Sequence, residues 1–156
     1  LLLRTCEFYK NVKKGPVSKV LYGFFKFLKF RLATRLGFSI PENVVDEGLQ
    51  LPHYGTIVIN GKAKIGKFCK IHVCVNIGAS AGELLAPKIG DYVYIAPGAK
   101  IYGDIEIASR VAIAANAAVS KSCLQNDVVL GGVPAKVIGE VDIYKLIHGK
   151  EGVLIS

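Results

Sequence analysis

Apolar residues recur at every sixth position through the middle of the chain. Of the eleven positions at this spacing from 59 to 119, ten carry isoleucine or valine, and the exception is Glu83. The following residue is usually small, as at Gly66, Gly90 and Ala114, which lets the backbone bend tightly. One inward isoleucine for each short strand, followed by a corner, is typical of a three-sided prism with stacked parallel strands. The spacing therefore predicts an all-β solenoid, a parallel β-helix with three hexapeptides in each coil.

The alternative is an antiparallel sandwich, because residues i, i+4 and i+6 also alternate with period two. A sandwich needs a hairpin turn and a change of register between strands, whereas the single Asn-Gly pair, at 60–61, lies inside the repeat. Glu83 breaks the pattern, so we expect residues 80–87 to leave the prism as a loop that keeps the phase. The expected sides are then Leu51, Ile71, Ile89 and Ile107; Ile59, Ile77, Ile95, Ile113 and Gly131; and Ile65, Ile101 and Val119.

The segments on either side of the repeat differ from it. Residues 1–36 are predicted to form a basic amphipathic α-helix, for which Pro16 provides a start signal and Gly37 a stop. Its apolar stripe consists of Val17, Val20, Leu21, Phe24, Phe25, Leu28 and Leu32. Residues 37–139 form the β-helix domain, and residues 140–156 form a tail whose apolar side chains are expected to cap the open end of the prism.

The charge is concentrated in the first segment. The chain has a net charge of +8, and residues 1–36 hold nine Lys and Arg against Glu7 alone, whereas the remainder is balanced. A nucleic-acid-binding domain would carry basic residues on its main surface, so nucleic acid is not an expected partner. Three interpretations of the basic helix remain open. It is exposed to solvent, it packs on its own domain or on a sister subunit, or it contacts an anionic membrane peripherally.

The remaining composition indicates the compartment. No apolar run reaches the ~18 residues of a membrane-spanning helix, and the first residues lack a signal-peptide pattern. The four cysteines form no CxxC pair, which favours free thiols in a reducing cytoplasm. We therefore expect a cytoplasmic protein, with the inner face of the membrane as a second possible location.

His53 is the strongest candidate for chemistry. It lies two residues after the inward Leu51 and between Pro52 and Gly55, so its side chain is expected to point outward. An imidazole titrates near physiological pH and therefore suits a general base. His72 lies one coil away. The spacing of His and acidic residues offers no metal site, so no metal cofactor is expected.

Residues 37–139 resemble the hexapeptide-repeat acyltransferases, and most of all the serine acetyltransferases and related O-acetyltransferases of surface-polysaccharide gene clusters. The matching segments are Ile40-Pro41, 49–72 (LQLPHYGTIVINGKAKIGKFCKIH), 75–80 (VNIGAS), 87–107 (PKIGDYVYIAPGAKIYGDIEI), 111–122 (VAIAANAAVSKS) and 131–139 (GGVPAKVIG). The resemblance covers about two thirds of the chain. It implies a left-handed parallel β-helix, trimers or dimers of trimers, and acetyl-CoA bound in a cleft between neighbouring prisms.

The resemblance also implies roles for individual residues. His53 matches the base that takes the proton from an acceptor hydroxyl as it attacks the thioester. Pro97 and Ala115 match residues that contact the pantetheine arm of acetyl-CoA through their backbones. Lys121 is expected to extend this row of acetyl-CoA contacts along the prism. Lys136 lies at the far end, where its cationic side chain can hold a CoA phosphate. His72 is a candidate contact for the acceptor.

Two departures from serine acetyltransferases concern the acceptor. Phe38 occupies the position of the aspartate that pairs with the catalytic histidine, so Glu42, Asp46 or a backbone carbonyl would have to orient His53. Leu85-Ala86 replaces the Arg-His pair that binds the amino acid. We therefore predict an acetyl-CoA-dependent O-acetyltransferase acting on a sugar of a surface polysaccharide or its precursor, and working as a homotrimer. Serine is the alternative acceptor, and a non-catalytic scaffold docked by its basic helix is the alternative class.

Overall fold

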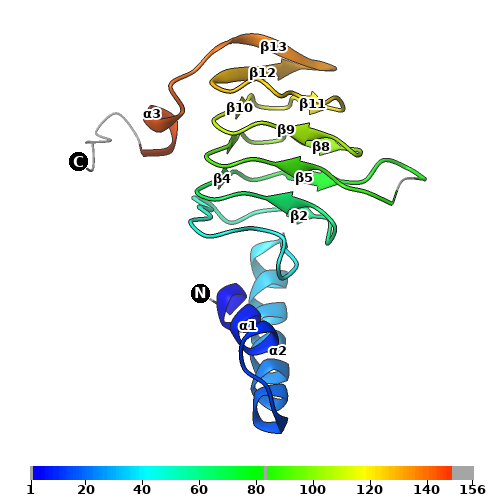
Figure 1. Ribbon diagram of the computed structural model, residues 1–156, viewed down its shortest axis with the longest axis vertical. Helices are drawn as coiled ribbons and strands as arrows, with labels where there is room; N and C mark the ends of the chain where they lie inside the picture. The colour runs from blue at the N-terminus through cyan, green and yellow to red at the C-terminus, as the bar shows by residue number, and fades with distance from the viewer. Residues whose placement is uncertain (1, 83, 149–156) are drawn as a thin grey trace.

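Three sheets, parallel except for the last strand of the second, form the sides of a prism in the computed structural model, which describes residues 2–82 and 84–148 (Figure 1). The first sheet contains β1 (Phe38–Ser39), β2 (Ile57–Ile59), β5 (Val75–Gly78), β8 (Lys100–Tyr102) and β11 (Ala118–Val119). The second contains β4 (Lys70–Ile71), β7 (Tyr94–Ile95), β10 (Ala112–Ile113), β12 (Val128–Gly132) and β13 (Ala135–Glu140). The third contains β3 (Lys64–Ile65), β6 (Lys88–Ile89) and β9 (Glu106–Ile107). The predicted parallel β-helix is confirmed, and the antiparallel sandwich is excluded.

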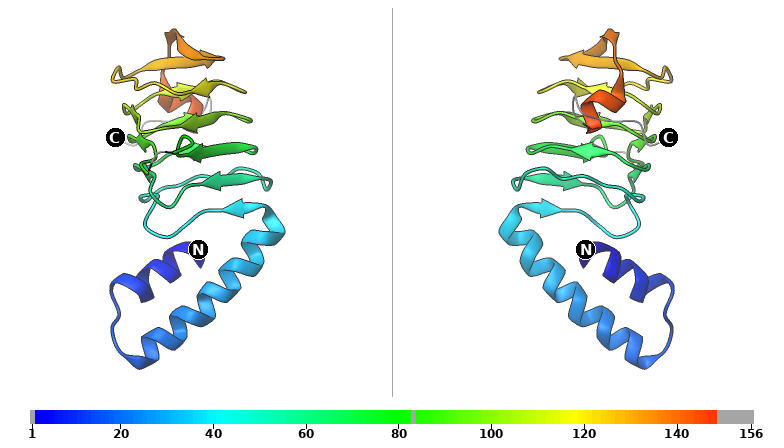
Figure 2. Two further views of the ribbon diagram at one scale, coloured as in Figure 1. Left: turned by 90° about the vertical axis from the view of Figure 1, so that its right-hand side faces the viewer. Right: turned by 90° about the vertical axis from the view of Figure 1, so that its left-hand side faces the viewer.

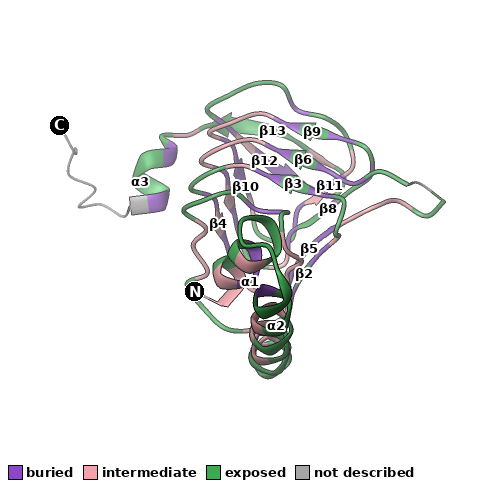
Figure 3. Ribbon diagram, turned by 60° about the horizontal axis from the view of Figure 1, so that its bottom comes forward, coloured by how far each residue is buried: buried purple, intermediate pink, exposed green. Residues whose placement is uncertain are grey.

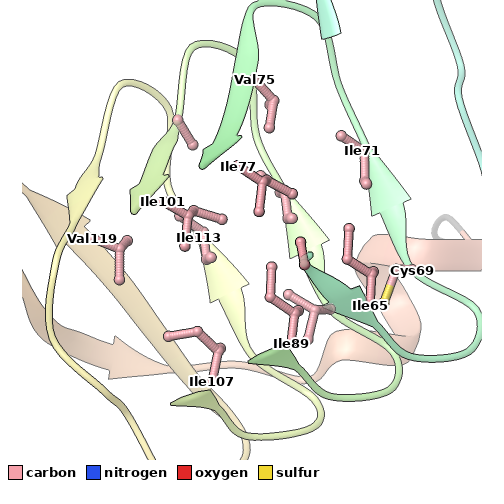
Figure 4. Close-up of a cluster of buried hydrophobic side chains, with 14 of the residues drawn as sticks. Ile65, Cys69, Ile71, Val75, Ile77, Ile89, Ile101, Ile107, Ile113 and Val119 are labelled. Carbon is pink, nitrogen blue, oxygen red and sulfur yellow. The ribbon is translucent and has the colours of Figure 1, made fainter. Parts of the chain in front are cut away.

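The core is a set of isoleucine stacks inside the prism (Figure 4). Each short strand points one apolar side chain inward and its neighbour outward, as in β2, where Ile57 and Ile59 are buried and Val58 is exposed. Ile71, Ile95 and Ile113 lie in register in successive coils and are fully buried. Stacking like side chains at the strand spacing of about 4.8 Å excludes water from the whole axis of the prism.

The sides of the prism differ from the expected ones after residue 78. Eighteen residues separate Ile59 from its neighbour Ile77, but twenty-four separate Ile77 from its neighbour Ile101. The expected loop is present between β5 and β6 and projects from the prism (Figure 1). It takes up one hexapeptide, so every later strand moves to the next side. Ile89 and Ile107 therefore stack on Ile65, and Ile71 stacks with Ile95. Glu83 itself lies outside the described residues.

The N-terminal segment is a helical hairpin, where the sequence predicted one helix. It consists of α1 (Leu2–Asn11) and α2 (Pro16–Leu36), and it extends from one end of the prism (Figure 2). Residues 12–15 separate the two helices, and Pro16 lies in the first turn of α2, where a backbone N–H would have no intrahelical partner. Gly37 ends α2 in the left-handed conformation, with φ 79°, and its N–H donates to the carbonyl of Ala33 or Thr34. None of the helices in the described ranges is long and apolar enough to cross a bilayer.

The hairpin splits the predicted apolar stripe into two faces. Leu21, Phe25 and Leu28 are half-buried, and the Phe25 ring stacks on the Tyr9 ring of α1 at 5.4 Å between centroids. Val17, Val20 and Phe24 are exposed on another side of α2. The stripe was too wide for one neighbouring helix to cover, and α1 covers only part of it.

Polar side chains attach the hairpin to the prism. The Glu42 carboxylate accepts hydrogen bonds from Lys29, from Lys10 at 3.4 Å and from the Tyr22 hydroxyl at 3.3 Å. Arg4 donates to the Val45 carbonyl at 2.7 Å and also to the carbonyl of Asp46. Glu42 therefore joins both helices to the first coil of the prism.

The charge on Glu42 should make this attachment pH-dependent. Burial by itself raises the pKa of the Glu42 carboxyl, but the hydrogen bonds and charges of Lys29 and Lys10 outweigh it, so the folded pKa lies below the ordinary value. The stabilisation is therefore present above the unfolded pKa and is lost as the pH falls through the folded pKa. The protection factors of the amides in α1 and α2, which correct for the slower intrinsic exchange in acid, should therefore decrease at low pH.

Glu42→Gln is the matched variant for this measurement. Its amides should have lower protection factors than those of wild type at pH 7 and equal ones below the folded pKa of Glu42, where both side chains are neutral. A constant difference between the two proteins across this pH range would show that the charge of Glu42 has no part in the attachment.

The C-terminal end of the prism is closed differently from our expectation. Strand β13 turns back and pairs antiparallel with β12, and it covers the last coil. The helix α3 (Ile143–His148) does not lie over the end (Figure 1). Its Ile143 and Ile147 pack against Ala112 and Tyr94 on the outer face of the second sheet. Residues 149–156 of the predicted capping tail lie outside the described residues.

Candidate active site

His53 lies in the exposed turn between β1 and β2, as the sequence predicted. The turn is held against the end of α2, because the Gly55 N–H donates to the Leu36 carbonyl at 2.9 Å. Gly55 has a φ of 144°, and a Cβ there would lie 3.0 Å from Cγ1 of Val73 in the next coil. Glycine at this position therefore lets the His53 turn lie directly against the next coil.

Two further aromatic rings follow His53 along the prism. The His72 ring lies 6.1 Å from the His53 ring between centroids, and the Tyr94 ring lies 5.0 Å from the His72 ring. The backbone fixes this series, since the His72 N–H donates to the Ile95 carbonyl at 3.0 Å. The structure thus brings together the two histidines that the sequence singled out.

His72 is held in its neutral form. Desolvation is the largest cause that lowers its pKa. The positive charge of Lys70 lowers the pKa further, as does His53 whenever its ring is protonated. Its Nε2 atom is buried without a hydrogen-bond partner among the described residues. A neutral His72 places no cation beside His53 at neutral pH, so it does not oppose uptake of a proton by the His53 imidazole.

Pro97 and Ala115 lie above the histidines at one corner of the prism. Both are exposed, and they follow the paired residues Ile95 and Ile113. The corner is continuous, because the Gly98 N–H donates to the Val73 carbonyl and the Asn116 N–H donates to the Pro97 carbonyl, each at 3.0 Å. The His53 turn contacts the same corner through Val73, so the predicted base lies at the foot of a shallow wall of small residues.

Lys121 and Lys136 lie together at the far end of the prism. Both line a hollow of about 310 Å³, in which Ser122 and Gln125 also take part. Lys121 follows a strand of the first sheet, whereas Pro97 and Ala115 follow strands of the second. The four predicted cofactor contacts therefore form two groups, one along the corner above His53 and one in the end hollow.

The residues considered for orienting His53 do not reach it. The Glu42 carboxylate is bound to Lys29, Lys10 and Tyr22 in the hairpin. Asp46 contributes backbone groups, with its N–H bonded to Ile65 and its carbonyl to Arg4. Phe38 packs against the core from β1. Of the hydrogen bonds within residues 2–82 and 84–148, none joins Glu42 or Asp46 to the His53 ring.

A larger hollow, of about 470 Å³, lies between the hairpin and the base of the prism. Its lining is almost entirely apolar, and Arg4 and Lys29 within it are already bound to Glu7 and Glu42. We assign it no chemistry. In the described part of the chain, no group of three His, Cys, Asp or Glu residues lies together as metal ligands would.

Tyr94 was missed by the sequence analysis. Coils of three hexapeptides would place residue 94 beside Asn76, which lies in β5, the next strand after His72. The extra hexapeptide in the loop instead pairs Tyr94 with Lys70, which brings its ring to His72. Only the correct length of that one coil would have revealed the contact.

The comparison with protein families agrees with this architecture. Residues 86–121 match the family described as bacterial transferase hexapeptide (six repeats). The chain is a hexapeptide-repeat protein. As the sequence indicated, the proteins similar to this hexapeptide-repeat protein include serine acetyltransferases.

Three relatives define the similarity. The serine acetyltransferase of Mycobacterium tuberculosis is 36% identical over 102 residues, which are 64% of this chain and 44% of that protein. The enzyme of Buchnera aphidicola subsp. Acyrthosiphon pisum is 31% identical over 129 residues, 80% of this chain and 47% of the other. The Brucella abortus serine acetyltransferase, solved in complex with coenzyme A, superposes with a TM-score of 0.73 at 29% identity, covering 90% of this chain and 54% of that one. The hexapeptide-repeat protein thus spans about half the length of these relatives.

Proposed function

We propose that this protein is an acetyl-CoA-dependent O-acetyltransferase that acetylates a hydroxyl group. The observation that carries the proposal is the position of His53, an exposed imidazole at the foot of a wall of small residues with a neutral histidine beside it. The similarity to serine acetyltransferases, one of them solved with coenzyme A, supports the same reaction.

The chemistry assigned to His53 is proton transfer. Acetyl-CoA supplies an acetyl group activated as a thioester. The His53 imidazole accepts the proton of the acceptor hydroxyl while its oxygen attacks, and it returns that proton to the leaving thiolate. A base within hydrogen-bond reach is typically worth about 10²–10⁴-fold in rate. His72, kept neutral, leaves His53 free to take up the proton.

The residues present suit a CoA molecule. Pro97 and Ala115 offer exposed backbone and little side-chain bulk for the pantetheine arm. Lys121 and Lys136, together in one hollow, present two cations to phosphate groups. We further infer the left-handed coil of the related folds and a homotrimer, in which the corner wall of one prism is covered by a neighbour. The four cysteines are free thiols, which suits the reducing cytoplasm that we expect.

The acceptor that we infer is a sugar hydroxyl. Leu85 is exposed on the loop and Ala86 is buried, so neither offers a charge to an amino-acid carboxylate. Serine is the second candidate, favoured by the similarity to serine acetyltransferases. A scaffold without activity is the third, but the exposed His53 and the paired lysines are features that a scaffold does not need.

An acceptor screen tests the proposal. The full chain is incubated with acetyl-CoA and single acceptors, and free thiol is followed against a reaction without acceptor. We expect kcat/KM to be highest for sugars or glycan fragments with free hydroxyls and lower for serine. If kcat/KM is higher for serine than for any sugar, the inferred acceptor is wrong. If no hydroxyl compound causes release of free thiol, the proposed acetyltransferase activity is wrong.

A further inference from the structure

One face of α2 is apolar and uncovered. Val17, Val20, Phe24, Phe27 and Phe30 are between 54% and 72% exposed, and we call these five residues the helix face. At 100° per residue they span about 140° of the helix circumference. The helix α1 packs along another side of α2 and leaves this side open (Figure 2), and the exposed turns of α2 are visible in Figure 3.

Cations without acidic partners surround the helix face. At 100° per residue, Lys19 and Lys26 lie along one edge of the face, Arg31 lies within its arc and Arg35 lies at its other edge. The ion pairs of the hairpin, within the described residues, use Arg4, Lys10 and Lys29 instead. Two of the free cations rest on aromatic rings, with Lys26 5.4 Å from the Tyr22 centroid and Arg31 5.9 Å from the Phe27 centroid.

We propose that the helix face is a docking surface for a membrane that contains anionic lipids. Phenylalanine and valine side chains enter the boundary between headgroups and acyl chains, while long cationic side chains keep their charges at the lipid phosphates. The positive charge around the helix face favours a membrane over a second copy of the chain as its partner. A second copy would oppose four unpaired cations with four more and supply no acid, whereas an anionic bilayer supplies the complementary charge.

The position of the hairpin suits this contact. It extends beyond one end of the prism, so the helix face can lie on a flat surface while the coils above remain in water (Figure 1). The His53 turn lies at the junction with α2, because Gly55 is bonded to Leu36. The surface is distinct from the corner wall and from the end hollow, so the inference goes beyond the proposed activity and does not depend on it.

Vesicle co-sedimentation of the full chain tests the proposal. We expect binding to vesicles of phosphatidylcholine with phosphatidylglycerol, and at least tenfold weaker binding to phosphatidylcholine alone. Binding should fall strongly in about 1 M salt, where the screening length is about 3 Å. Failure to bind the anionic vesicles at low ionic strength would overturn the proposal.

Two pairs of variants separate charge from apolar contact. Lys19→Gln with Lys26→Gln should weaken binding to anionic vesicles by about 25-fold, since each cation near such a surface contributes on the order of fivefold. The control is Lys62→Gln with Lys88→Gln, which removes the same charge from exposed positions on the prism and should bind like wild type. Phe24→Ser with Phe27→Ser should weaken binding at least tenfold with an unchanged circular-dichroism spectrum.

Light scattering on the same proteins completes the test. If Phe24→Ser with Phe27→Ser changes the oligomeric state and leaves vesicle binding intact, the helix face is a contact between copies and the proposal is wrong. Equal losses in the two lysine pairs would also contradict it, because binding would then follow net charge and not this face.

Discussion

Replacing His53 with alanine is expected to lower kcat for acetyl transfer by about 10²–10⁴-fold. The alcohol then has to attack while its proton is still bound, because the described side chains place no other imidazole at the exposed end of the ring series. The fold should persist, since the exposed His53 side chain fills no core space. The KM for acetyl-CoA should change little, because Lys121 and Lys136 lie at the far end of the prism.

Tyr54→Ala is the matched control for this experiment. Tyr54 is 80% exposed in the same turn, so its removal disturbs the same backbone without touching the imidazole. It should keep most of the activity. An active His53→Ala protein, together with an inactive His72→Ala protein, would transfer the role of base to His72.

Replacing Ile77 with alanine is expected to destabilise the prism by about 2–5 kcal/mol. Ile77 is fully buried and lies in register between Ile59 and Ile101, so its truncation leaves a cavity in the middle of a stack. The rigid parallel strands above and below cannot collapse into that space without losing their pairing. Urea unfolding followed by circular dichroism, at one fixed protein concentration, measures the change.

Val58→Ala is the control for the core. Val58 is in β2 beside the same stack, but its side chain points outward and is 37% exposed. Its truncation should cost about 0.5 kcal/mol or less. Similar losses for Ile77→Ala and Val58→Ala would show that the inward stacks do not dominate the stability of the prism.

The sequence was sufficient for the local structure of the prism and insufficient for its long-range order. The period of six has a local cause, because each inward isoleucine is followed by a residue small enough for a corner. It can therefore be read directly from the amino-acid sequence. Which strands share a side depends on where the chain returns after the loop between β5 and β6. An excursion that occupies a whole hexapeptide keeps the period while moving every later strand by one side. The period alone cannot reveal this shift.

The candidate site was predictable to a similar extent. His53 could be placed because its outward direction depends only on its distance from Leu51 within one coil. The neighbours of His72 could not, since Tyr94 reaches it across the coil with the extra hexapeptide. The sequence likewise does not reveal that the chain reverses between Asn11 and Pro16. This reversal depends on packing against the prism through Glu42, a contact between residues far apart in the sequence.

The antiparallel direction of the last strand, β13, affects how copies of this protein can associate. Strands β1 to β12 all run in one direction along their sheets, so an open last coil would template the first coil of another copy in the same polarity. Repeated head to tail, such contacts would give a filament without a natural length. Strand β13 presents the opposite polarity on a single sheet, and the helical hairpin lies across the other end. These two features oppose head-to-tail growth along the axis and favour discrete particles over filaments.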